Sequence, residues 1–333
     1  MKVFDRVYSK SIITEPPVIE LIESYPLQRL KGIRQYGLPP QFYHNHSFSR
    51  HEHSVGVFLL LRKLGAALEE QVAGLLHDIS HTAFSHLTDA VLGNAPDSDV
   101  QDARHKGFLL SSEVAGILSR HKIKPERIAN LDNFPLLERD APELCADRVD
   151  YTLREFATRK DRPHPNLFLD QIAVHKGKIV FTEHDAAKSF ALNYLSSMAD
   201  EWAGIDKTVR QHLFASALRV AVEDNVISIE DLFEDDEHVL GKIASTRHPA
   251  IRATLSLLSQ DFSLEENEKD PDFDIPRHFR YVDPGYLSRG KIKQLSKTDR
   301  DFRDIVKMRK NRHGQGVRVK IVGKHEIINK IAS

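Results

Sequence analysis

The side chains best suited to chemistry in this sequence are two histidines and two aspartates. His77 and Asp78 stand side by side at the end of an apolar run, residues 72–76, while His53 lies upstream and Asp147 downstream. Imidazole and carboxylate groups are both ordinary metal ligands, so the four can close around one divalent cation. An ion held in this way keeps positions open for water and a phosphate oxygen. These residues therefore predict the metal site of a hydrolase.

Histidines are concentrated around this candidate site. Of the 18 in the chain, eight lie in one third of the sequence: His44, His46, His51, His53, His77, His81, His86 and His105. Imidazole is the commonest metal ligand and proton carrier near neutral pH, so this region is where we expect the site. We place His44 and His46, which belong to no motif, in a loop. The ligand types do not select among Fe, Mn, Zn, Ni and Mg for the one predicted ion.

Separate helices must deliver these ligands to one point. Residues 49–68 have apolar side chains at helical spacing, and His53 shares their inward face. Residues 70–78 are apolar nearly all round, which predicts a buried helix ending at the His-Asp pair. Adjacent residues on a regular helix point about 100° apart, so both can reach one ion only at the helix end. A third helix, starting near Pro142, carries Asp147.

The rest of the pattern predicts a mainly α fold with a helical core, one small β-hairpin and a short α+β C-terminal appendage. Pro26 must interrupt the helical pattern of residues 21–36. Two short β-type runs within residues 172–181 predict the hairpin, and long helices follow. Residues 265–274 form an acidic connector that we take as a boundary, giving a helical domain at 1–260 and a basic appendage at 261–333 with a terminal strand.

Composition limits the classes of function. With 333 residues the chain is long for one domain. Lys and Arg total 47 against 48 Asp and Glu, a formal charge of −1; nucleic acid is thus not an expected partner, although a local basic groove stays open. The single cysteine, Cys145, fits a reducing compartment. No signal-peptide core and no apolar run near the ~20 residues of a membrane span are present. We expect a cytosolic protein without membrane contact.

The motifs resemble those of the HD-superfamily phosphohydrolases, most closely the deoxynucleoside triphosphate triphosphohydrolase branch. The similar segments are Arg50-His51-Glu52-His53-Ser54, His77-Asp78-Ile79-Ser80-His81-Thr82-Ala83-Phe84-Ser85-His86, Asp147-Arg148-Val149-Asp150-Tyr151 and Gln28-Arg29-Leu30-Lys31-Gly32-Ile33-Arg34-Gln35. The resemblance covers roughly residues 1 to 155 and then fades. It implies an HD-domain enzyme that binds one divalent metal.

The resemblance also implies roles for individual residues. His53, His77, Asp78 and Asp147 would be the metal ligands. The residues facing the phosphates would be Arg50, His81, His86, Arg148 and Tyr151, with Gln35 near the sugar. His105 resembles the general acid that protonates the leaving oxygen, with solvated surface as its alternative, and Asp89 could orient it. For the further phosphate contacts of the triphosphohydrolases, Lys207 and Arg210 are only approximate candidates.

The predicted activity is hydrolysis of a nucleotide phosphate ester or anhydride, with a dNTP as one candidate substrate. A metal-activated water would attack phosphorus and a histidine would protonate the leaving oxygen. One alternative is a phosphatase for nucleoside monophosphates or other small phosphoesters. Another is a non-catalytic nucleotide sensor whose basic C-terminal residues contact a partner or RNA, although a pure binder has no need of four intact ligands. The resembling enzymes commonly form multimers, which makes a homo-oligomer a further prediction.

Overall fold

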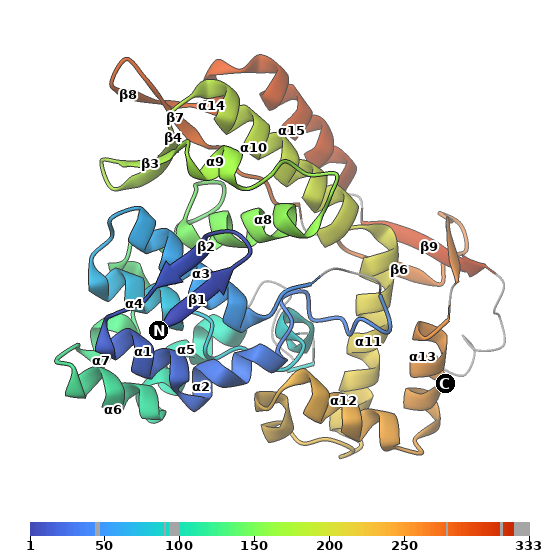
Figure 1. Ribbon diagram of the computed structural model, residues 1–333. Coiled ribbons are helices and arrows are strands. Elements are labelled where there is room, and N and C mark those ends of the chain that lie inside the picture. Colours follow the sequence, from blue (N-terminus) through green and yellow to red (C-terminus); the bar gives the residue numbers. More distant parts are fainter. Residues whose placement is uncertain are drawn as a thin grey trace.

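The computed structural model is mainly helical, and the residues that it describes include three small sheets (Figure 1). It describes residues 1–43, 47–89, 91–92, 100–260, 262–277, 279–313 and 316–322. His44 and His46 lie outside these ranges. The predicted fold class, a helical core with small β elements, is confirmed. Among the described residues, no helix combines the length and the apolarity that crossing a lipid bilayer requires.

The elements follow in chain order. Up to the helix that carries Asp147 they are β1 (Lys2–Asp5), β2 (Ser9–Ile12), α1 (Pro16–Glu23), α2 (Tyr25–Arg29), η1 (Leu30–Gly32), α3 (Arg50–Lys63), α4 (Leu68–Leu76), η2 (Ser85–Thr88), α5 (Val100–Ser111), α6 (Glu113–Arg120), α7 (Pro125–Ile128), η3 (Leu131–Asn133) and α8 (Ala146–Thr158). After it come α9 (Asn166–Leu169), β3 (Ile172–His175), β4 (Lys178–Phe181), α10 (His184–Ser197), the π-helical turn η4 (Met198–Trp202), α11 (Ile205–Glu223), η5 (Glu230–Phe233), α12 (Asp236–Ser245), α13 (Pro249–Leu258), β5 (Ser263–Glu266), β6 (Phe273–Ile275), β7 (Gly285–Ser288), β8 (Lys291–Gln294), α14 (Leu295–Thr298), α15 (Arg300–His313) and β9 (Val317–Val322).

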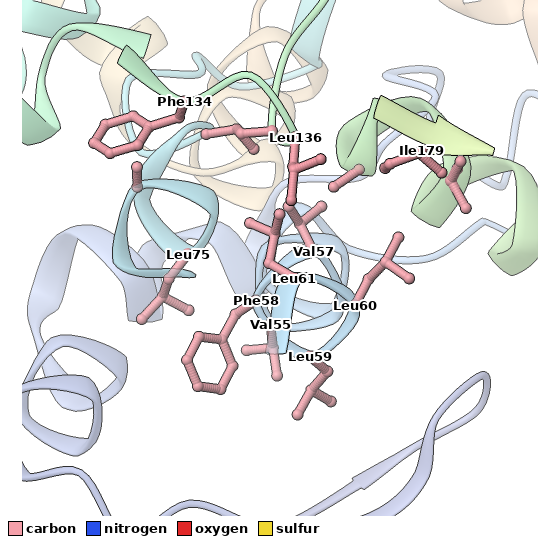
Figure 2. Packing of buried hydrophobic residues seen from close by; sticks show 14 of the residues in the cluster. Val55, Val57, Phe58, Leu59, Leu60, Leu61, Leu75, Phe134, Leu136 and Ile179 are labelled. Carbon is pink, nitrogen blue, oxygen red and sulfur yellow. The ribbon is translucent and has the colours of Figure 1, made fainter. Parts of the chain in front are cut away.

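Helix α3 is the centre of the main core. Every residue from Ser54 to Leu61 is buried, and its side chains radiate toward neighbours on several sides (Figure 2). Ser49 caps its N-terminus by accepting a hydrogen bond from the Glu52 amide at 3.1 Å. The helix ends at Lys63, before the predicted residue 68, because Gly65 takes a left-handed φ of 74° that stops the α-helix. A helix buried on all sides gives His53 a rigid support.

Helix α4 packs beside α3 and ends at Leu76, so His77 is its C-cap rather than an interior residue. Its buried residues are Val72 to Leu76, as the apolar run predicted. Asp78 therefore lies just beyond the helix end. This confirms the expectation that the pair stands at a helix terminus.

Other local predictions have mixed outcomes. The chain restarts at Pro26 between α1 and α2, the hairpin of β3 and β4 forms as predicted, and β9 is a strand. The prediction of an acidic connector at residues 265–274 is wrong at both ends. Residues 263–266 and 273–275 are strands β5 and β6, which flank β9 in one sheet. Pro142 does not start a helix either, since α8 begins at Ala146.

The residues after 260 pack into the rest of the molecule. Strand β7 pairs with β4 in a four-stranded sheet, β3-β4-β7-β8, and Leu295 and Phe302 are buried in the same core cluster as α3. Strand β9 adds Val317, Val319 and Ile321 to a second cluster built around α11 and α13. The domain division at residue 261 stays a prediction, but these contacts join the C-terminal residues to both cores.

Candidate functional site

Three segments far apart in the sequence bring the predicted metal ligands together. His53 comes from α3, His77 from the end of α4, and Asp147 from the first turn of α8. His53 Nε2 lies 2.9 Å from Asp147 Oδ1 and 3.3 Å from His77 Nε2, and His77 Nε2 lies 3.5 Å from Asp147 Oδ1. Asp78 adjoins them, with Oδ1 3.4 Å from His77 Nε2 and Oδ2 3.9 Å from His53 Nε2. Ligand atoms of His53, His77 and Asp147 all lie within 4.8 Å of one another, and Asp78 stands beside this group.

The spacing of these atoms fits one cation. An ion with bonds of about 2.1 Å sets neighbouring ligand atoms roughly 3.0 Å apart in octahedral geometry and about 3.4 Å apart in tetrahedral geometry. The separations of 2.9–3.5 Å among His53, His77 and Asp147 agree with these values to within 0.1 Å. Two imidazoles with carboxylates are also a ligand set that many divalent metals accept. The residues present therefore fit the metal that the sequence predicts.

Both histidines turn their Nε2 atoms toward the cluster because their Nδ1 atoms are held from behind. His77 Nδ1 lies 2.7 Å from the carbonyl oxygen of Gly74, and His53 Nδ1 lies 2.7 Å from Asp150 Oδ2. A carbonyl and a carboxylate only accept hydrogen bonds, so the Nδ1 atoms carry the hydrogens. In the neutral rings the lone pairs then lie on Nε2, facing the other predicted ligands. This is the arrangement in which imidazoles bind metals.

The charges at the cluster favour a cation. Burial disfavours charge on His77, but Asp78 and Asp147 outweigh it and raise its pKa to about 9. Burial likewise opposes ionisation of Asp147, yet hydrogen bonds from His53 and His77 hold its pKa below the usual range. Such carboxylates remain charged, and their field, which attracts a proton to His77 in the metal-free protein, attracts a metal ion equally.

Arg50 and His81 flank the cluster on the Asp78 side. Arg50 is buried; its Nη1 donates to Asp78 Oδ2 at 2.9 Å and its Nε to Ser85 Oγ at 3.0 Å. His81 Nε2 lies 3.3 Å from Asp78 Oδ1. Burial and the nearby Arg50 charge lower the pKa of His81 to about 3, so it is neutral at physiological pH. The structure thus brings both next to the metal ligands, while phosphate contact stays a prediction.

Two predicted catalytic residues have positions that differ from expectation. Asp89 Oδ2 lies 3.1 Å from His86 Nδ1, and no hydrogen bond joins it to His105, so it does not orient that histidine here. His86 is half-exposed and meets the His81 ring edge-on, with centroids 5.0 Å apart. The physical reason is proximity: Asp89 follows His86 by three residues across the turn of η2.

His105 is buried on α5, with 3% of its surface exposed, so the alternative of a solvated surface loop is wrong. Its Nδ1 lies 3.5 Å from Ser80 Oγ, and its Nε2 has no hydrogen-bond partner within the described part of the chain. Burial, together with the nearby His77 charge, lowers its pKa to about 4. A neutral imidazole with a free ring nitrogen therefore borders the site, and its role as general acid stays a prediction.

The cluster opens into a pocket of about 880 Å³. Gln35, Arg148 and Tyr151 all line it, as predicted for substrate contacts. Gln35 Oε1 is buried and unpaired among the described residues, whereas the Tyr151 hydroxyl lies 2.9 Å from that of Tyr194. Arg148 is less available for phosphate contact than expected, because its Nη1 donates to the Glu143 carbonyl at 2.6 Å and its Nη2 to the Arg139 carbonyl at 3.3 Å.

Sequence reasoning missed part of the pocket wall. Trp202 stands edge-on to the Tyr194 ring, with centroids 4.9 Å apart, and Arg277 and Arg280 reach the pocket from the chain after β6. Lys207, an approximate candidate, also lines it; the ammonium lies 4.3 Å from the Tyr36 ring centroid. The signal in the sequence was the helical spacing that puts Lys207 on the same face of α11 as the apolar Phe214, and the structure shows this face buried.

Arg210, the other approximate candidate, has a structural role. Its Nη1 donates to the carbonyl oxygens of Phe42 at 3.1 Å and Leu258 at 3.0 Å, and its Nε to Asp206 at 3.0 Å. The guanidinium lies over the Phe262 ring, 4.2 Å from the centroid. Arg210 thus joins α11 to its neighbours. The two residues differ in role although they stand three positions apart on one helix.

Comparison with known proteins agrees with this geometry. A family model described as HD domain matches residues 50–155, the segment that contains all four predicted ligands. Over 328 residues the chain is 34% identical to the Uncharacterized protein YdhJ of Bacillus subtilis, which spans 97% of this chain and 99% of that protein. It is 40% identical over 151 residues to the Metal-dependent phosphohydrolase cns2 of Cordyceps militaris, 45% of this chain and 44% of that protein.

Two further similarities are more distant. A stretch of 104 residues, 27% of this chain, is 35% identical to 16% of the Deoxynucleoside triphosphate triphosphohydrolase SAMHD1 of Xenopus laevis. The fold matches the crystal structure of a Phosphohydrolase from Bacteroides thetaiotaomicron with a TM-score of 0.65, over 89% of this chain and 94% of that one, at 16% identity. The HD-domain match, the similarity to YdhJ over nearly the whole chain and the similarity to the phosphohydrolase cns2 together show the family. The chain belongs to the HD-domain family of metal-dependent phosphohydrolases.

Proposed function

We propose that this phosphohydrolase acts on nucleotides, and that nucleoside polyphosphates, including dNTPs, are its preferred class. The observation that carries the proposal is the character of the pocket beyond the ligand cluster. The aromatic rings that line it are those of Tyr36, Tyr151, Tyr194 and Trp202. The pocket is also lined by cationic side chains from separate parts of the fold, namely Lys106, Arg148, Lys207, Arg277 and Arg280. Cations suit a chain of phosphates, and aromatic rings suit a base or sugar face.

His53, His77, Asp78 and Asp147 would hold one divalent ion. The ion would supply Lewis-acid activation of a water molecule and of the phosphoryl group. The residues around it have their own tasks. Arg50 donates to Asp78 and so fixes that carboxylate, while its remaining positive charge stabilises negative charge that develops on a phosphate nearby.

His105 is our candidate for the proton donor to the leaving oxygen. Its unpaired Nε2 can hydrogen-bond to a substrate oxygen, and a phosphate dianion next to the ring would raise its pKa from about 4 toward the working range. We assign Asp89 no part in this step, because its carboxylate contacts His86 rather than His105.

The name of the similar triphosphohydrolase, SAMHD1, supports the release of triphosphate, although the similarity extends over only 27% of this chain. Lys207 supports a polyphosphate substrate more directly. Burial lowers the pKa of its ammonium to about 8, and a buried ammonium beside a pocket gains most from a dense anionic partner. A monophosphate has less charge with which to compensate these cations.

The experiment incubates metal-loaded protein with dNTPs, NTPs, nucleoside monophosphates and a small aryl phosphate, and identifies the products. We expect triphosphate release from nucleoside triphosphates. Orthophosphate from monophosphates alone would establish the phosphatase alternative instead, and binding without turnover would establish the sensor. His77→Ala, which removes a ligand, is the control for a contaminating enzyme. Sedimentation of the same protein tests the predicted homo-oligomer.

A further inference from the structure

A fully buried carboxylate, Asp150, stands directly behind one of the metal ligands. It is one helical turn after Asp147 on α8, and its Oδ2 accepts the hydrogen bond from His53 Nδ1 at 2.7 Å. Arg154, which is also fully buried, donates to the same carboxylate through Nε at 2.7 Å and Nη2 at 3.3 Å. Because Asp150 accepts on both oxygens, its position depends on every group that donates to it.

The N-terminal hairpin of β1 and β2 supplies two of the remaining contacts of this pair. The Tyr8 hydroxyl, in the turn between the strands, donates to Asp150 Oδ1 at 2.7 Å. Asp5 Oδ2 accepts from Arg154 Nη2 at 2.7 Å. The other oxygen of Asp5 accepts from the amides of Val7 and Tyr8 at 2.8 and 3.0 Å, which shapes the turn that presents the tyrosine.

The hairpin is tied to α3 and α8 rather than lying loosely over them. Arg6 Nη2 donates to Glu52 Oε2 at 3.0 Å, and the other oxygen of Glu52 accepts from Arg154 Nη1 at 3.0 Å. The side chain of Asp5 is only 3% exposed, so its charge and that of Arg154 compensate each other in a place with little water. A surface hairpin with a solely protective function has no need of a buried charged connection to α8.

We propose that the β1–β2 hairpin is a positioning element of the metal centre: through Tyr8 and Asp5 it holds the carboxylate that orients His53. This inference rests on the proposed metal site. Neither hairpin residue touches a ligand, so both act through Asp150, which selects the ring tautomer with hydrogen on Nδ1 and leaves the Nε2 lone pair for the ion. Loss of the Tyr8 hydroxyl removes one of the donors that keep the carboxylate in place.

The test measures the affinity of the metal-free protein for Mn²⁺ and for Zn²⁺ by competition with a chromophoric chelator. Tyr8→Phe should weaken binding ~3- to 10-fold, less than the ~10- to 100-fold loss typical when the direct partner of a ligating histidine is changed, which we expect for Asp150→Asn. Tyr25→Phe is the matched control, because it deletes a hydroxyl that bonds a carboxylate, Glu234, at 3.1 Å on an exposed part of the molecule. It should leave the affinity unchanged.

A second variant guards against a folding defect. In Asp5→Asn the side-chain oxygen still accepts the two turn amides, whereas the charge facing Arg154 is lost. Among neutral His53 rings, both hairpin variants should also lower the fraction that carries the hydrogen on Nδ1, as read from histidine nitrogen NMR shifts. A purely structural role would not change that fraction in a folded protein.

The outcomes separate this inference from the proposed function. If wild type binds metal, His77→Ala does not, and Tyr8→Phe binds as tightly as wild type, the hairpin has no positioning role although the metal site stands. If wild type itself binds neither ion, the metal site fails and the inference fails with it. A weakened Tyr8→Phe beside an unchanged Tyr25→Phe supports both.

Discussion

A single methyl group at Gly56 should disrupt the buried charge cluster behind His53. Gly56 lies within α3, and a Cβ built there would meet Arg154 Nη2 at 1.7 Å and Asp150 Oδ1 at 2.3 Å. Real Cβ atoms do not approach other atoms below about 3.0 Å, so the guanidinium or the carboxylate must move. Neither can move freely, because Arg154 is fully buried and bonded to Asp5, Glu52 and Asp150.

The magnitude follows from two opposing effects. Breaking a buried ion pair typically costs about 3–5 kcal/mol, since one charge is left without compensation. Alanine in place of glycine within a helix contributes roughly 0.5–1 kcal/mol in the opposite direction. We therefore expect Gly56→Ala to lower the free energy of unfolding by about 2–4 kcal/mol. The measurement is denaturant unfolding of the metal-free protein, because bound metal would add stability of its own.

Gly241→Ala is the control for this experiment. Gly241 lies within α12, and a Cβ there has no neighbour within 4 Å. It should gain the helical contribution of roughly 0.5–1 kcal/mol without any loss. If Gly56→Ala is as stable as wild type while Gly241→Ala shows the expected gain, the close approach of Arg154 to α3 is wrong. The proposed role of the hairpin, which depends on the position of Arg154, would then lose part of its structural basis.

Three further predictions test the site itself. Arg50→Gln leaves the buried Asp78 without its ion pair, so unfolding of the metal-free protein should show a loss of about 3 kcal/mol. Lys207→Met should raise the KM for nucleoside triphosphates roughly 10-fold, the effect of one charged contact, and leave turnover of a small aryl phosphate unchanged in steady-state assays. In the metal-free protein, the folded pKa of His77, about 9, exceeds its unfolded value of about 6.5. The stability contributed by the protonated ring is therefore complete below pH ~6.5 and lost as the pH rises through ~9. The denaturant midpoint of unfolding should fall over that window, whereas the midpoint of the metal-loaded protein should not.

The sequence predicted those parts of the molecule that depend on local pattern. The buried positions Val57, Leu60 and Leu61, the restart at Pro26 and the hairpin at residues 172–181 each follow from apolar spacing or from one residue type within a short window. The candidate ligands His53, His77 and Asp147 could also be predicted from the sequence, because each stands in a recognisable motif. Their convergence could be expected from the resemblance before any distance was known.

Long-range pairing could not be predicted in the same way. Residues 263–266 and 273–275 are rich in acidic side chains, which favour a solvated connector over a strand. They become strands because β9, some 50 residues later, pairs with both of them. The pairing is supported by Val317, Val319 and Ile321 of β9, which are buried in the second core cluster. The contact expected between Asp89 and His105 likewise depended on tertiary placement: the Asp89 carboxylate contacts His86, three residues earlier across the turn of η2.

Gly56 shows that a motif can require a small residue for a reason other than metal binding. Within Arg50-His51-Glu52-His53-Ser54-Val55-Gly56, only His53 would touch a metal, and a glycine inside a buried helix lowers helical stability. The glycine becomes intelligible once Asp150 and Arg154 are placed against it, since no larger residue leaves room for the carboxylate that holds His53. Arg154 in turn needs Asp5, 149 positions away. The N-terminal hairpin and the middle of α3 are therefore coupled: a side chain at Gly56 should displace the same carboxylate that loss of the hairpin contacts would release, and both changes should weaken the hold on one histidine.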